Sequence, residues 1–170
     1  MMSAAELPSL KPDSDSSGAT CKFSTPSVSV LPQSQQQAEQ LLGEFLQIAR
    51  EQGQDQLSAF IDGDAGIGEF LGAVFSLSPY LNGLARNYPA VVALCWKQGF
   101  KQAMDQTLSV VEDASFHDND EKTLIAQLRI AKKQAALICG LADLGGWWSW
   151  KTVSAEITRT ADVTLAAATR

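Results

Sequence analysis

The residues that could do chemistry begin with two aspartates in a glycine-rich segment, residues 62–68, which read Asp-Gly-Asp-Ala-Gly-Ile-Gly. A glycine-rich loop at a helix N-terminus can hold a phosphate through its backbone N–H groups. However, no strand is predicted before this segment, it lacks Gly-Lys-Ser/Thr, and Asp62 and Asp64 would repel a phosphate. A calcium loop that opened at Asp62 would need a glutamate at its twelfth position, where Ala73 stands. The segment is therefore predicted to be a turn and not a binding site.

Histidine and cysteine supply few candidates for catalysis or metal binding. His117 is the only histidine, and although it could act as a base, an exposed loop position is the favoured interpretation. The three cysteines are odd in number and far apart, and they fit neither a disulfide framework nor a zinc site. Cys95 and Cys139 lie on apolar helix faces, which indicates core positions, and no Gly-x-Ser-x-Gly motif is present. The residues alone predict no catalytic, cofactor-binding or metal-binding residue.

Two surface features could bind a partner. Arg129, Lys132 and Lys133 share one helix surface and could hold an acidic partner or a nucleotide phosphate, although a solvated stripe is the favoured interpretation. Residues 147–150, Trp-Trp-Ser-Trp, could anchor an interface, although packing of the last helix on its neighbour is the more ordinary explanation. Asp143 lies in the last turn of a predicted helix, where the macrodipole disfavours a carboxylate. We therefore expect it to have a partner, such as Lys132 or a backbone N–H beyond the following glycines.

The overall composition excludes several classes of protein. The chain has 170 residues, which allows one domain and little else, and its 19 acidic and 13 basic residues give a net charge of −6. An acidic chain without a basic block does not favour nucleic acid, because phosphate contacts dominate that affinity. No apolar run approaches the roughly 18–20 residues of a membrane span, and no secretory signal is present. The cysteine usage suits a reducing cytoplasm.

The elements that must position these residues are helices, because apolar residues recur at spacings of three and four from Ser34 onward. The pattern predicts an all-α array of about five or six helices, without a convincing strand. Residues 78–79 and 88–89, Ser-Pro and Tyr-Pro, are typical of helix starts, and the second is expected to open a long helix to Val111 that Gly99 bends. The helix that ends at Gly145 is apolar on two sides, which predicts packing between neighbours.

The N-terminal segment differs from the helical body, residues 34–170. Residues 1–33 hold four of the six prolines and many serines, which predicts a disordered or loosely held tail, although a patch such as residues 28–31 could dock on the body.

The last helix is predicted to begin near Trp147 or Trp150. Its apolar residues continue towards Arg170 without a glycine cap or a proline stop, so a truncated chain and a frayed natural end are equally favoured.

Two blocks of sequence resemble one known family. Residues 70–81 read Phe-Leu-Gly-Ala-Val-Phe-Ser-Leu-Ser-Pro-Tyr-Leu, and Tyr-Pro at 88–89 and Leu94 follow. The second block is Leu-Arg-x-x-Lys at 128–132, then Asp-Leu-x-Gly at 143–146, Val153, and Ala-Asp at 161–162. In order and spacing these motifs resemble bacterial bifunctional glutamine synthetase adenylyltransferase/adenylyl-removing enzymes, over about residues 35–170.

This resemblance implies a helical part of a large cytoplasmic enzyme that controls nitrogen assimilation. One nucleotidyltransferase domain of such enzymes moves AMP from ATP onto a tyrosine of glutamine synthetase, and the N-terminal one removes it with phosphate. Both need Mg²⁺, and PII-type signal proteins set the direction. The implied partners are therefore glutamine synthetase and a PII-type protein, and the implied cofactors of the full-length family are Mg²⁺ and ATP.

The chain departs from the family in one respect that bears on catalysis. The family's catalytic signature, a glycine-rich loop followed by Ser-Asp-x-Asp, would come after the last helix, and no such motif occurs up to Arg170. We therefore expect the helical lead-in of the adenylyl-removing half, inactive alone and without a bound cofactor, and we expect its last helix to leave apolar surface bare. The alternative is a self-contained helical interaction module, with residues 147–150 or the Arg129 stripe as its surface.

Overall fold

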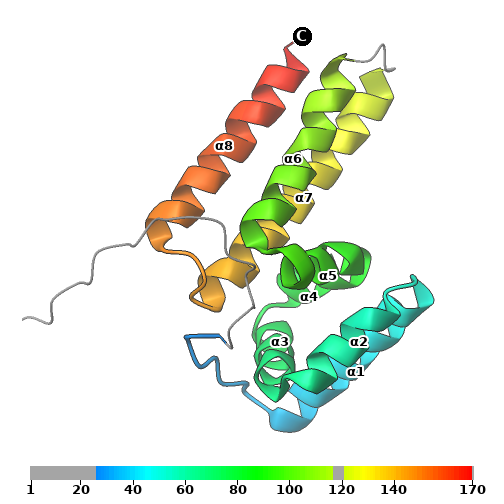
Figure 1. The fold of residues 1–170 in the computed structure, drawn as a ribbon, viewed down its shortest axis with the longest axis vertical. Coiled ribbons are helices and arrows are strands. Elements are labelled where there is room, and N and C mark those ends of the chain that lie inside the picture. The colour runs from blue at the N-terminus through cyan, green and yellow to red at the C-terminus, as the bar shows by residue number, and fades with distance from the viewer. Residues whose placement is uncertain (1–25, 117–120, 170) are drawn as a thin grey trace, which may run out of the picture.

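A computed structural model describes residues 26–116 and 121–169, and in these ranges the protein consists of helices and connecting loops without strands (Figure 1). The eight helices of these ranges are α1 (Gln35–Glu51), α2 (Asp55–Gly63), α3 (Ala65–Leu77), α4 (Pro79–Asn87), α5 (Pro89–Gln98), α6 (Phe100–Phe116), α7 (Glu121–Leu144) and α8 (Trp150–Ala168). The all-α prediction is confirmed, and the number of helices exceeds the predicted five or six. Among the described residues, no helix combines the length and the apolar character that a bilayer crossing requires.

The additional helices arise where glycine and aspartate end one helix and start the next. The predicted turn at residues 62–68 is wrong, because Asp62 and Gly63 end α2 and the Asp64 carboxylate accepts the backbone N–H of Gly66 at 3.0 Å as the N-cap of α3. The predicted long helix from Pro89 is two helices, because Gly99 has φ +104° and ends α5. Only glycine adopts such a backbone conformation without strain, so the chain turns there instead of bending.

The helix start at residues 78–79 is as predicted. The Ser78 hydroxyl accepts the N–H of Leu81 at 3.2 Å, and Pro79 occupies the first helical position, where a missing N–H costs nothing. Pro89 begins α5 in the same way, but its cap residue Tyr88 makes no side-chain bond.

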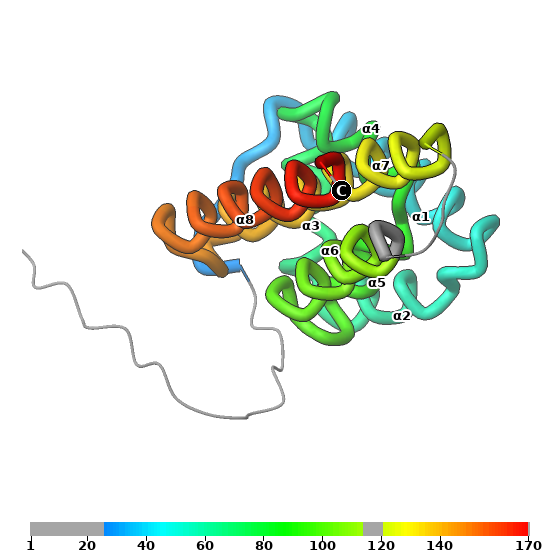
Figure 2. The backbone as a smooth tube through the Cα atoms, turned by 90° about the horizontal axis from the view of Figure 1, so that it is seen from above, coloured from blue at the N-terminus to red at the C-terminus, as the bar shows by residue number. Residues whose placement is uncertain are grey.

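The helices form two parts, which Figure 1 shows one above the other. Helices α1 to α5 pack in the lower part, and α6, α7 and α8 run side by side through the upper part, as the view from above in Figure 2 also shows. The main core joins α1–α7, and a small second core of Val111, Ala131 and Ala167 joins α6, α7 and α8. Helix α7 contacts α4, α5, α6 and α8, which confirms that it packs between neighbours.

The corner between α7 and α8 is held by aromatic packing and by the segment before α1. The Trp147 ring lies 4.9 Å from that of Phe100 and 5.2 Å from that of Phe70, which confirms a packing role for this tryptophan. Ser27 N–H donates to Gly145 O at 3.1 Å, and Val30 packs against the main core, so part of the predicted tail does dock on the body. Residues 1–25, which hold the rest of that tail and Cys21, lie outside the described residues.

Candidate functional site

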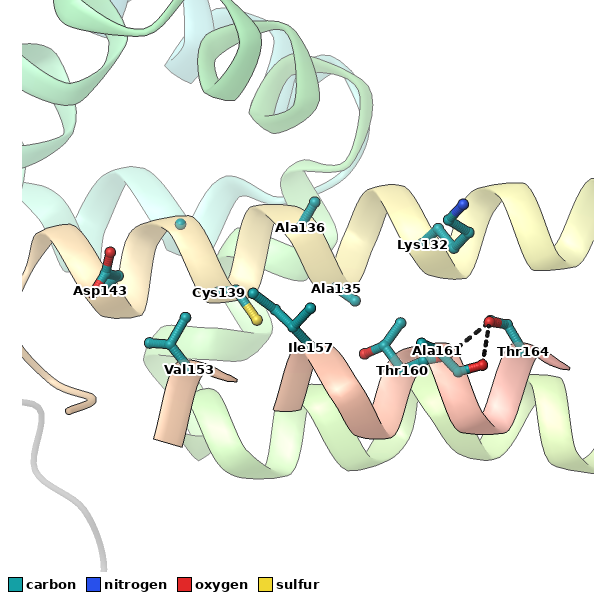
Figure 3. Close-up of a pocket in the computed structure, with 11 residues that line it drawn as sticks. Lys132, Ala135, Ala136, Cys139, Asp143, Val153, Ile157, Thr160, Ala161 and Thr164 are labelled. Atoms are coloured by element: carbon teal, nitrogen blue, oxygen red, sulfur yellow. Dashed lines mark hydrogen bonds between the residues drawn. The ribbon is translucent and has the colours of Figure 1, made fainter. Parts of the chain in front are cut away.

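An apolar groove of about 480 Å³ lies between α7 and α8 on the upper part of the protein (Figure 3). Its α7 side is made of small residues, among them Ala135, Ala136 and Cys139. Its α8 side includes Val153 and Ile157, and Ile157 faces Cys139 across the groove. A concave apolar surface with few polar groups is suited to binding an apolar partner.

Opposite charges mark the two ends of the groove. Lys132 lies at one end and Asp143 at the other, eleven positions away on α7, and both are exposed. The expected partner of Asp143 was wrong: within residues 26–116 and 121–169 its carboxylate forms no hydrogen bond and no ion pair, and Gly146 N–H bonds to its backbone carbonyl instead. Because the residue is exposed, water can solvate this carboxylate at the helix end.

The side of α8 that packs on the body buries the polar residues Glu156 and Thr160 beside apolar ones, which the sequence pattern did not indicate. The pattern counted Val153, Ile157, Ala161, Leu165 and Ala168 as the apolar face of the last helix. In the structure Ile157 is 56% and Leu165 64% exposed, and the buried residues of α8 are Glu156, Thr160 and Ala167. The expectation that this helix leaves apolar surface bare is therefore confirmed, and Ile157 also lines the groove.

A cluster of four charged residues, Lys101 and Asp105 of α6 with Glu156 and Arg159 of α8, joins the two helices. Lys101 Nζ donates to Glu156 Oε1 at 3.0 Å and to Asp105 Oδ1 at 3.0 Å. Arg159 Nη1 donates to Glu156 Oε2 at 3.2 Å and also to Asp105. Glu156 is only 7% exposed, and each of its carboxylate oxygens pairs with a cation, Oε1 with Lys101 of α6 and Oε2 with Arg159 of α8 itself. Sequence reasoning missed this cluster; the one signal was a glutamate within an otherwise apolar helix pattern.

The pKa values of the cluster follow from this pairing. Burial alone would raise the pKa of Asp105, but hydrogen bonds from Lys101 and Arg159 outweigh it and lower that pKa below its ordinary value. Burial opposes the charge of Lys101 and Arg159 as well, and the bonds to Asp105 and Glu156 nevertheless raise the pKa of both cations. Lys101, Asp105 and Arg159 therefore remain charged near neutral pH.

These carboxylates do not fit Mg²⁺ or the phosphates of ATP. A magnesium ion needs free carboxylate oxygens and is repelled by cations, whereas both oxygens of Glu156 and the Oδ1 of Asp105 accept hydrogen bonds from Lys101 or Arg159. Among the described residues, no group of three or more histidine, cysteine or acidic side chains could hold a metal ion. The cluster is suited to fixing α8 on α6.

The other residues that the sequence analysis considered are dispersed. Cys95 and Cys139 are buried free thiols, as predicted, and burial, with Glu156 and Asp143 nearby, raises the pKa of Cys139 to about 11. Arg129 and Lys133 are exposed with Lys132, as expected of a solvated stripe. Trp150 is exposed at the start of α8. His117 lies outside the described residues.

Comparison with known proteins identifies the family. The family described as glutamate-ammonia ligase adenylyltransferase matches residues 68–170, which hold most of α3 and all of α4–α8. Relatives named bifunctional glutamine synthetase adenylyltransferase/adenylyl-removing enzyme include one from Mesorhizobium japonicum, 32% identical over 122 residues, covering 71% of this chain and 12% of the relative. Another, from Rhizobium meliloti, is 26% identical over 146 residues, covering 83% of this chain and 15% of the relative.

The match therefore concerns a small part of much longer proteins, and no solved structure matches the chain. The matched residues include both helices of the groove and all four residues of the charged cluster. By this match the chain belongs to the glutamate-ammonia ligase adenylyltransferase family.

Proposed function

We propose that this chain forms the helical part of an enzyme that adds AMP to glutamine synthetase and removes it again. The observation that carries the proposal is the family match over residues 68–170, in the helices that build the groove and the charged cluster. The names of the relatives supply the reaction and glutamine synthetase as its substrate. A self-contained interaction module of another kind is not favoured, because it would not account for a match over α4–α8.

Within such an enzyme the chain supplies structure and a docking surface, and the reacting groups lie elsewhere. The carboxylates of the charged cluster are occupied by Lys101 and Arg159, and Cys139 is a buried thiol whose raised pKa keeps it protonated. ATP and Mg²⁺ would bind to other parts of the polypeptide, a PII-type protein would regulate the direction of the reaction, and the enzyme would act in the cytoplasm. These further features come from the resemblance.

A pair of assays tests the proposal. The chain alone, given ATP, Mg²⁺ and glutamine synthetase, should transfer no AMP, and given phosphate and adenylylated glutamine synthetase it should release none. The Mesorhizobium relative should lose adenylyl removal when its matched segment is deleted and regain it when that segment is replaced by the matching residues of this chain. Turnover by the chain alone, or an exchange that leaves a folded but inactive enzyme, would contradict the proposal.

A further inference from the structure

The groove between α7 and α8 has the shape and length to bind one more helix. Lys132 and Asp143 are eleven positions apart on α7, which spans about 16 Å at about 1.5 Å per residue, or three helical turns. Ile157 stands exposed on the α8 side, and the short side chains of Ala136 and Ala161 leave room between the two helices. An amphipathic helix commonly binds such a groove through residues spaced three and four apart.

The charges at the two ends give this helix a direction. A helix N-terminus carries a partial positive charge and its C-terminus a partial negative charge. Asp143 therefore favours a helix N-terminus at its end of the groove, and Lys132 favours a C-terminus at the other. Neither side chain is paired within the described residues, so both remain available. The favoured helix runs antiparallel to α7 and parallel to α8.

The relatives indicate where such a helix comes from. The matched segment makes up 12% of the Mesorhizobium relative and 15% of the Rhizobium relative, so in these proteins it occurs within a much longer polypeptide. An exposed apolar face on two helices within the family match is typical of a surface that other parts of the same protein cover. The burial of Glu156 and Thr160 on the packed side of α8 supports this, because Ile157 and Leu165 are then directed outward.

We propose that the α7–α8 groove binds an amphipathic helix of the same enzyme, from a part of the family's polypeptide outside the segment matched here, with its N-terminus at Asp143. This inference rests on the proposed function, because it takes the partner from the relatives. It assigns the groove to assembly of the enzyme and gives α7 and α8 a role in positioning the parts that carry the reaction.

Binding of peptides to the full chain tests the inference. Overlapping peptides of about 20 residues, long enough for the three turns of the groove, would cover the Mesorhizobium relative outside its 122 matched residues. Fluorescence anisotropy of each labelled peptide, titrated with the chain, gives its affinity. At least one peptide that becomes helical on binding should bind, and a spin label at its N-terminus should broaden the resonances of residues near Asp143 and not those near Lys132.

Two matched variants show whether the groove is the binding surface. Ile157→Asp places a charge on the exposed rim of the groove, and Ala155→Asp places the same charge on an exposed position outside it. Ile157→Asp should weaken binding at least about tenfold, while Ala155→Asp should leave it within about twofold. Equal circular dichroism and thermal unfolding of the two variants would show that both are folded.

Several results would overturn the inference. It fails if no peptide binds, if Ile157→Asp binds as well as the parent chain, or if the spin label reports the opposite direction. It also fails if light scattering finds a dimer that Ile157→Asp dissociates, because a second copy is then the occupant. If the peptides fail while the exchanged Mesorhizobium enzyme remains active, only the assignment of the groove is lost and the proposed function stands.

Discussion

Replacing Glu156 by glutamine should destabilise the protein far more than the same change at an ordinary surface ion pair. Glu156 is 7% exposed and accepts charge-assisted hydrogen bonds from Lys101 at 3.0 Å and Arg159 at 3.2 Å. Glutamine has nearly the same shape, but it is uncharged and keeps one acceptor oxygen. Glu156→Gln therefore removes the negative charge on which the two cations of different helices converge, and it changes little else.

The expected loss of stability depends on how far Glu156, Lys101 and Arg159 are exposed to water. A hydrogen bond to a charged group contributes about 1.5–3 kcal/mol, and breaking a buried pair costs up to about 5 kcal/mol. Here the side chains of Lys101 and Arg159 are 57% and 36% exposed, so water can solvate both cations after the substitution. This solvation reduces the cost, and we expect the free energy of unfolding to fall by about 2 kcal/mol.

Urea unfolding followed by circular dichroism at low ionic strength would measure the change, since urea does not screen charges. A loss of about 2 kcal/mol corresponds to a decrease in Tm of about 4–8 °C for a chain of this size. Glu44→Gln is the matched control: its partner is Arg86 at 3.1 Å, both side chains are about 40% exposed, and the expected loss is below about 1 kcal/mol. If Glu156→Gln changed the free energy of unfolding by no more than Glu44→Gln, the reasoning from burial would be refuted.

Three further predictions concern other parts of the structure. Folding lowers the pKa of Asp105, so its ionised carboxylate stabilises the protein fully above the ordinary aspartate pKa of 3.8. This stabilisation is lost as the pH falls through the lowered pKa. Acid unfolding of Asp105→Asn should therefore depend less on pH than that of the parent chain. Iodoacetamide should label Cys139 at least about a hundredfold more slowly in the folded than in the urea-unfolded chain at pH 8, because burial raises its pKa to about 11; equal rates would place the thiol at the surface. Gly99→Ala should lower the free energy of unfolding, measured in urea, by about 1–3 kcal/mol, because φ +104° strains any other residue although the space around Gly99 is open. Gly43→Ala within α1 is the control and should not destabilise the protein.

Local signals in the sequence predicted the helix starts better than the helix count. Ser78 and Pro79 allowed the start of α4 to be predicted, because a hydroxyl cap and a proline at the first helical position act within one helical turn. Asp64 follows the same rule, but its capping role was hidden within a glycine-rich segment that resembles a turn. Gly99 was placed correctly as an irregularity, and only its φ distinguishes a helix end from a bend.

The packing of α8 could not be predicted, because it depends on residues far away in sequence. Periodicity predicts that the most apolar face of a helix is buried. By this rule the face of Ile157 and Leu165 should be buried and Glu156 should be exposed. Glu156 is buried because Lys101, 55 positions earlier, supplies a cation at 3.0 Å. No pattern within a single helix contains that information. For the same reason the groove was missed as a site, although the sequence did indicate that apolar surface on this helix would remain bare.

The charged cluster also determines which side of α8 faces outward. The apolar residues of α8 are spaced by four: Val153, Ile157, Ala161 and Leu165. Because of this spacing, a shift of α8 by one turn, or a rotation that turned these residues towards the body, would still offer apolar side chains for packing. The ion pairs between the helices would not be retained, because only the observed position brings Glu156 to Lys101 and Arg159 to Asp105. A rotation that buried Ile157 would break the two pairs that cross between the helices, Lys101 with Glu156 and Arg159 with Asp105, and the loss of a buried pair costs up to several kcal/mol. The polar interface thus excludes the more apolar alternative, and it is the reason that α8 offers its apolar residues to the groove.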